Sequence, residues 1–70
     1  MWLKQEEVER LAERAIQKGI SISEKNNIIN TLFTYRKAAI PAYMKMIESK
    51  QVLDSEKQQI YDNIQKINES

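Results

Sequence analysis

Apolar residues recur at helical spacing in three stretches of the chain. In the first, from about residue 3 to 18, they follow the i, i+3, i+4, i+7 spacing of one buried stripe: Val8, Leu11, Ala12 and Ala15. Gly19 follows, and glycine most readily takes the left-handed conformation that ends a helix. Ser21 to Glu24 then matches a capping box, which starts a new helix. The pattern predicts a tight helical hairpin.

The second stretch, residues 23 to 49, is the most apolar. Its apolar side chains cover roughly 200° of the helix circumference, about twice what packing on one neighbour requires. One side of this arc holds Ile28, Leu32, Tyr35, Ala39, Ala42 and Met46, and Ile29, Phe33, Ile40, Met44 and Ile47 fall beside them. Pro41 falls on the polar side, where it would kink or briefly break the helix. We therefore predict a long central helix that contacts two partners.

A third helix is predicted at residues 55 to 68, with one narrow apolar stripe formed by Ile60, Tyr61, Ile64 and Ile67. The predicted fold is all-α: one domain of residues 1–70, a small three-helix bundle with a long, Pro-kinked central helix flanked by two shorter antiparallel helices. The expected core contains Val8, Leu11, Ala15, Ile28, Leu32, Ala39, Ile60 and Ile64.

The chain also contains a weak internal repeat. Residues in the first half match residues 32 positions later: Lys18, Ser23, Glu24, Lys25 and Ile28 correspond to Lys50, Ser55, Glu56, Lys57 and Ile60. A duplicated helical hairpin would give this match. Two helix starts that use the same capping residues would give it too, and the sequence favours that explanation.

Composition removes most catalytic chemistry. The 70 residues include no cysteine, no histidine and one glycine. Disulfides, thiolate or imidazole metal sites and glycine-rich phosphate loops are therefore excluded. No nucleophile lies beside a base, and the carboxylates Glu6, Glu7, Glu9 and Glu13 fit a solvated face. We expect no enzyme activity, no cofactor and no metal.

Length and composition also bear on location. No stretch reaches the roughly 20 apolar residues of a membrane span, and charged residues from Lys4 onward leave no apolar signal core. A cytoplasmic protein is the expectation. Frequent Lys, Ile, Asn, Gln and Glu are typical of low-GC bacteria and their phages.

Arg36 points to a binding surface, because its position lies within the apolar arc of the predicted central helix. Its guanidinium either pairs with a carboxylate or reaches out over apolar surface, or it marks an interface. The predicted interface residues are Phe33, Arg36, Ile40, Tyr43, Met44 and Ile47. The expected function is a small non-catalytic regulatory or adaptor protein that binds another protein or itself as a homodimer, without contacting a membrane.

The alternative is a nucleic-acid-binding regulator. Residues 21 to 50 carry an excess of positive charge from Lys25, Arg36, Lys37, Lys45 and Lys50. Ala15, Gly19 and Ser21 resemble the turn of a helix-turn-helix motif. Three positions that this motif keeps apolar hold Arg14, Lys18 and Lys25 instead. A protein partner is therefore the preferred prediction.

Overall fold

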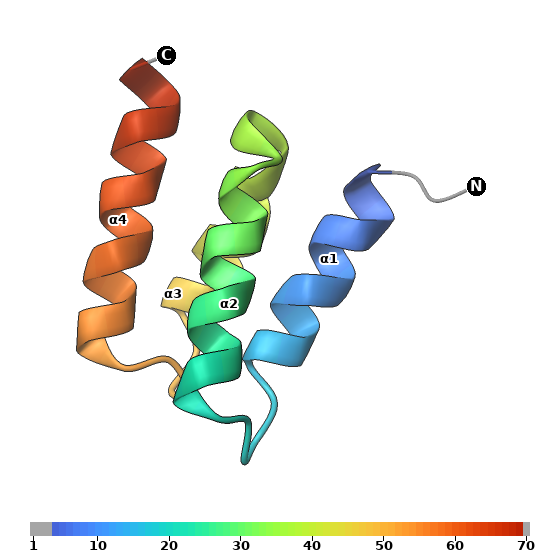
Figure 1. Cartoon of the computed structure of the whole chain (residues 1–70), viewed down its shortest axis with the longest axis vertical. Helices are drawn as coiled ribbons and strands as arrows, with labels where there is room; N and C mark the ends of the chain where they lie inside the picture. The colour runs from blue at the N-terminus through green and yellow to red at the C-terminus, as the bar shows by residue number, and fades with distance from the viewer. Residues whose placement is uncertain (1–3, 70) are drawn as a thin grey trace.

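The computed structural model describes residues 4–69, and within them every regular element is helical. The elements are α1 (Lys4–Ala15), α2 (Ile22–Phe33), the short 3₁₀ helix η1 (Arg36–Ala39), α3 (Ile40–Ile47) and α4 (Asp54–Glu69). Successive α-helices alternate in direction, so the first and last described residues lie at the same end of the bundle (Figure 1). The all-α prediction is confirmed.

The first hairpin follows the predicted signals. Gly19 has a φ of 82°, and the Ser21 side chain accepts a hydrogen bond of 3.1 Å from the Glu24 amide at the start of α2. Helix α1 ends at Ala15, earlier than predicted, and the predicted start at residue 3 lies outside the described residues.

The three-helix prediction is wrong, because the described residues form four α-helices. The predicted helix at 23–49 is divided into α2 and α3, which run in opposite directions (Figure 1). The chain reverses at Arg36, whose φ of 55° is left-handed and costs a non-glycine residue about 1–2 kcal/mol. Pro41 is neither a kink nor the break: it lies in the first turn of α3, where its missing N–H needs no partner.

Helices α1 and α4 each pack against both α2 and α3, and Figure 1 shows them on opposite sides of that pair. The reversal lets the two apolar sides of the predicted long helix share one core. Six of the predicted core residues are buried: Val8, Ala15, Ile28, Leu32, Ala39 and Ile60. Leu11 and Ile64 pack against this core and are half-buried.

Tyr43 lies at the centre of the bundle, with a relative exposure of 0%. Its hydroxyl donates a 2.6 Å hydrogen bond to the Ile29 carbonyl of α2 and accepts one of 3.2 Å from the Asn63 amide of α4. A buried hydroxyl needs such partners to offset the loss of water. Tyr43 therefore links α3 to both α2 and α4.

The helix bounds agree with the internal repeat. Adding 32 to the bounds of α1 gives 36 and 47, which are the bounds of η1 and α3 together, and adding 32 to residue 22 gives 54, where α4 begins. The fold is thus two helical hairpins of matching register, residues 4–33 and 36–69. The agreement favours a duplicated hairpin over two unrelated helix starts.

Replacing Tyr43 by phenylalanine tests the central position of its hydroxyl. Tyr43→Phe should lower the free energy of unfolding at neutral pH by about 1–2 kcal/mol, because the Ile29 carbonyl and the Asn63 amide lose a partner. Urea denaturation followed by circular dichroism measures this change. In Tyr61→Phe, which alters a phenol that is 50% exposed, stability should stay within about 0.5 kcal/mol of the wild type.

The same two variants should differ in how their stability depends on pH in alkaline solution. Burial raises the pKa of the Tyr43 phenol above its ordinary value of 10.0, and the hydrogen bond from Asn63 offsets part of the rise. Between the unfolded and the folded pKa, the folded state holds a proton that the unfolded state has lost, so stability falls as pH rises above 10.0. Tyr43→Phe should lose this decline and Tyr61→Phe should retain it. Equal declines in the two variants would contradict the assignment.

Candidate protein-interaction surface

The six predicted interface residues are not all at the surface. Tyr43 belongs to the core, so in this structure it offers no surface to a partner. The other five lie in two places. Phe33 and Arg36 lie at the corner between α2 and η1, and Ile40, Met44 and Ile47 lie along one side of α3.

At the corner, the Arg36 guanidinium carbon lies 4.6 Å from the centre of the Phe33 ring. Arg36 is exposed and Phe33 is half-buried, so this is a cation–π contact at the surface. Of the alternatives for Arg36, the structure fits the one in which the charged head reaches solvent over an apolar side chain. A contact of Arg36 with a partner remains a prediction.

On α3, Met44 is 48% exposed, while Ile40 and Ile47 are half-buried beside it. The Tyr43–Asn63 hydrogen bond sets the register between the antiparallel helices α3 and α4. In that register Met44 lies near the level of Tyr61, which is 50% exposed. We call Ile40, Met44 and Ile47 the α3 strip. Whether a partner contacts it remains a prediction.

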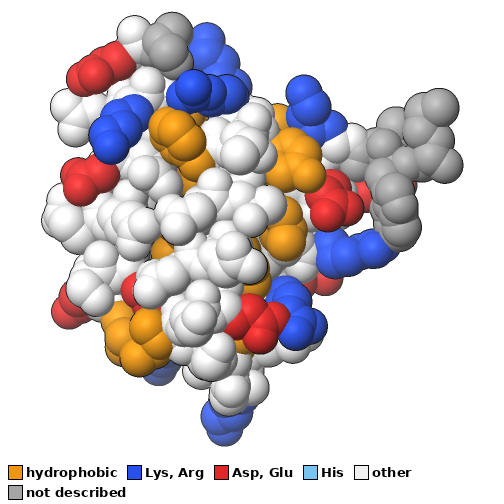
Figure 2. Space-filling model, viewed as in Figure 1, with side chains coloured by type: hydrophobic (Ala, Val, Ile, Leu, Met, Phe, Trp, Pro, Cys, Tyr) orange, Lys and Arg blue, Asp and Glu red, His pale blue; other side chains and the backbone are white. Residues whose placement is uncertain are grey.

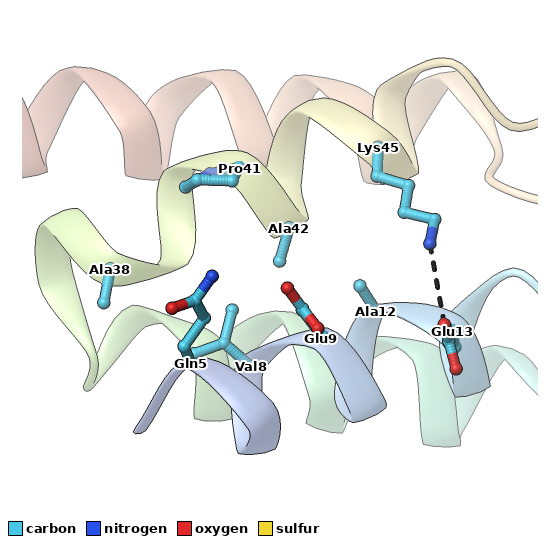
Figure 3. Close-up of a pocket in the computed structure, with 9 residues that line it drawn as sticks. All are labelled: Gln5, Val8, Glu9, Ala12, Glu13, Ala38, Pro41, Ala42 and Lys45. Carbon is cyan, nitrogen blue, oxygen red and sulfur yellow. Dashed lines mark ion pairs between the residues drawn. The ribbon is translucent and has the colours of Figure 1, made fainter. Parts of the chain in front are cut away.

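A groove lies on the other side of α3, where it faces α1 (Figure 3). Its volume is about 560 Å³, and it is lined by Gln5, Val8, Glu9, Ala12, Glu13, Ala38, Pro41, Ala42 and Lys45. The floor is apolar and made of small side chains: Val8, Ala12 and Ala42 are at most 4% exposed. The alanines hold α1 and α3 close together yet leave a hollow above them.

The rim of the groove is charged and asymmetric. Glu9 and Glu13 come from α1 and Lys45 comes from α3, so the α1 side is acidic (Figure 3). Lys45 Nζ lies 3.8 Å from Glu13 Oε1, and both side chains are more than half exposed. Such a pair contributes little to stability, so its charges remain available to a ligand.

Sequence reasoning did not find this groove. It assigned Pro41 to the polar side of a single helix and the α1 carboxylates to a solvated face. The residues were correctly placed at the surface, but their meeting across the bundle depends on the reversal at Arg36. The signal that could have pointed to it is the run of small residues at Ala38, Ala39 and Ala42, which permits a close helix approach.

One of the five cations in the basic middle of the chain, Lys25, lies inside the bundle. Lys25 is only 5% exposed, lies 3.1 Å from Glu56 Oε1 and donates a 2.8 Å hydrogen bond to the Gln51 carbonyl. Lys25 is the one basic residue of α2, the helix that would enter DNA in a helix-turn-helix protein. Figure 2 shows a largely uncharged surface over α2, with Lys and Arg mostly toward the edges.

Two further kinds of feature are not found in residues 4–69. No group of three or more acidic side chains there is placed to hold a metal ion. In the same part of the chain no helix combines the length and the apolar character needed to cross a bilayer. Neither finding tests the expectation that the protein is not an enzyme, which stays a prediction.

The chain matches no protein-family model, no curated protein and no solved structure. The support for a functional proposal therefore comes from the geometry of the chain itself.

Glu56→Gln tests whether Lys25 is committed to the interior. Glu56 Oε1 also accepts a 2.8 Å hydrogen bond from the Leu53 amide, and an amide oxygen can keep that bond while losing the charge. Lys25 would then be a buried cation without its counterion, and the free energy of unfolding should fall by about 3 kcal/mol or more. Denaturant unfolding measures the loss.

Glu24→Gln is the matched control, since Glu24 occupies the equivalent place in the first hairpin. Its partner Arg14 is 59% exposed, so this substitution should cost less than about 1 kcal/mol. Similar losses in the two variants would show that the buried pair is not distinct from the surface pair.

Proposed function

We propose that this protein is a small non-catalytic regulatory or adaptor module that holds a helical segment of another protein in the groove between α1 and α3. The observation that carries the proposal is a concave surface of about 560 Å³ with an apolar floor and a charged rim. Concave apolar surfaces with a few charged groups at their edge are the usual form of a binding site.

The shape of the groove favours a helix as its occupant. Two neighbouring helices with small residues between them form a groove along their contact. An amphipathic helix can fill such a groove with its apolar side chains. Ala12, Ala38 and Ala42 present methyl groups rather than long side chains, so the backbone of the partner can come close. Apolar side chains at i, i+3, i+4 and i+7 of the partner would follow the floor.

The charge of the rim favours a basic partner. The exposed carboxylates Glu9 and Glu13 line the α1 side, and the cation on the opposite side, Lys45, is already near Glu13. Like charges facing each other across an interface disfavour binding, whereas opposite charges speed association and set orientation. We therefore assign to the partner an apolar stripe bordered by Lys or Arg on the side that meets α1.

The alternative class, a nucleic-acid-binding regulator, has weaker support. Lys25 is inside the bundle, and α2 has no other cation to meet a phosphate backbone. The other four cations of residues 21–50 are exposed: Arg36 and Lys37 on η1, Lys45 on α3, and Lys50 after it. Of these, Lys45 lines the groove, where it lies near Glu13 of α1. Steep loss of binding with added salt would distinguish this class from an apolar groove.

Two synthetic amphipathic peptides test the groove. They share one apolar stripe of Leu and Ala, and lysines border the stripe in one peptide and glutamates in the other. The lysine-bordered peptide should shift the amide resonances of Val8, Ala12 and Ala42 in a ¹⁵N-labelled sample, and the glutamate-bordered peptide should bind at least about tenfold more weakly.

Charge-reversal variants then test whether Glu9 and Glu13 cause the difference in binding between the two peptides. Glu9→Lys combined with Glu13→Lys should weaken the lysine-bordered peptide by about tenfold or more, while Glu6→Lys, on the same helix but outside the groove lining, should change binding less than about threefold. Shifts at Met44 and Tyr61, with loss of binding in Met44→Glu, would assign binding to the α3 strip instead. No shift with either peptide would contradict the proposal.

A further inference from the structure

The reversal between α2 and α3 contains one left-handed residue, Arg36. Around the reversal, right-handed helical angles are recorded for Thr34 (φ −67°, ψ −20°), Tyr35 (−85°, −6°), Ala39 (−81°, −14°) and Ile40 (−59°, −46°). Arg36, with φ of 55°, is the one non-glycine residue with positive φ among those described. A change to negative φ at this residue would remove the left-handed step between α2 and η1.

The sequence at the reversal does not itself break a helix. Residues 34–39 contain neither glycine nor proline, and Arg36, Ala38 and Ala39 are among the better helix formers. Left-handed backbone is normally assigned to glycine, so an arginine in this conformation is held there by the packing of the rest of the chain. In a joined helix Pro41 would produce a bend without abolishing the helix.

The contacts that hold the reversal closed are contacts between the two hairpins. Each of them joins a residue of 4–33 to a residue of 36–69: Ile29 with Tyr43, Lys25 with Glu56, Asn30 with Gln59, and Glu13 with Lys45. None of these pairs depends on the two hairpins belonging to the same molecule. A second copy offers the same groups in the same arrangement.

We propose that Arg36 is a hinge through which two copies of this chain exchange their second hairpins. In the exchanged dimer α2 and α3 form one bent helix, and hairpin 4–33 of each copy packs against hairpin 36–69 of the other. The partner is a second copy, and the interaction surface is the inner face of each hairpin. This inference does not rest on the proposed function.

Strain at Arg36 favours the exchange, because each dimer relieves it at two hinges while keeping the contacts between hairpins. The opposing contributions are the loss of free motion of one molecule, the bend at Pro41 and the loss of the Arg36–Phe33 contact. Exchange requires the hairpins to separate, so monomer and dimer should convert slowly except near unfolding conditions.

Substitutions at the hinge separate the two forms. Each protein is unfolded in urea, refolded at millimolar concentration and measured by light scattering after chromatography. Arg36→Gly accepts positive φ and should raise the dimer dissociation constant by about tenfold or more. Arg36→Ala, a strong helix former that disfavours positive φ, should lower it by a similar factor.

Lys37→Ala is the matched control. It removes the same charge one residue later, within the helical turn of η1, and should leave the dissociation constant within about twofold of the wild type. If Arg36→Gly and Arg36→Ala change dimerisation in the same direction, loss of the side chain is responsible and the hinge is wrong. If wild type and Arg36→Ala both remain monomeric after this treatment, the proposal is overturned.

The chain contains no cysteine, so a pair can be introduced to read the connectivity of the dimer. Glu13→Cys with Lys45→Cys places two thiols at exposed, facing positions of α1 and α3. A flexible bis-maleimide should link the two chains of the isolated dimer and should close a loop within the isolated monomer, which denaturing gels distinguish. Loops within single chains in the dimer fraction would overturn the exchange.

A dimer formed through the α3 strip would behave differently. Met44→Glu should abolish such a dimer and leave the exchanged dimer intact, because Met44 lies outside the contacts between hairpins described above. Peptide binding by the isolated monomer is measured separately, so failure of the exchange leaves the proposed function standing, and the reverse also holds.

Discussion

The phenol of Tyr43 can be buried at the centre of this bundle because a carbonyl of α2 and an amide of α4 both meet its hydroxyl. That requirement constrains the other helices, since both partners must arrive at one point from different elements. Within one molecule, helix α3 must turn back toward α2 to bring the phenol to Ile29, and α4 must lie beside α3 to bring Asn63. The reversal at Arg36 is strained locally because the packing around Tyr43 demands it.

Local signals predicted the local structure well. The stripe in α1, the glycine at 19, the serine cap of α2 and the stripe in α4 each act over a few residues. Each was found near its expected place, except that Tyr61 of the α4 stripe is 50% exposed. The reversal could not be predicted in this way, because residues 34–39 contain no helix breaker. A broad apolar arc has two solutions: two neighbours around a straight helix, or a helix that folds back. The sequence pattern does not distinguish them.

The choice between a straight helix and a helix that folds back also decides where each predicted interface residue lies. On a straight helix Tyr43 would lie beside Arg36 on an open face, but the fold-back takes Tyr43 into the core and leaves Arg36 at the corner. The groove likewise joins residues from α1 and α3 that no local pattern connects. Lys25 and Glu56 illustrate a related limit, because a charge in a sequence does not show whether it will meet solvent or a buried counterion.

The matching register of the two hairpins has a consequence for synthesis. During translation, residues 4–33 are complete before the half that covers their apolar face has been made, and α1 with α2 alone has too little core to be stable. Ile28, Ile29 and Leu32, which are buried in the complete fold, are therefore exposed in the nascent chain until residues 36–69 of the same chain emerge. In the exchange proposed above, residues 36–69 of a second copy would cover that face instead. The rate of translation across residues 34–60 would then help to determine whether this second hairpin comes from the same molecule or from another copy.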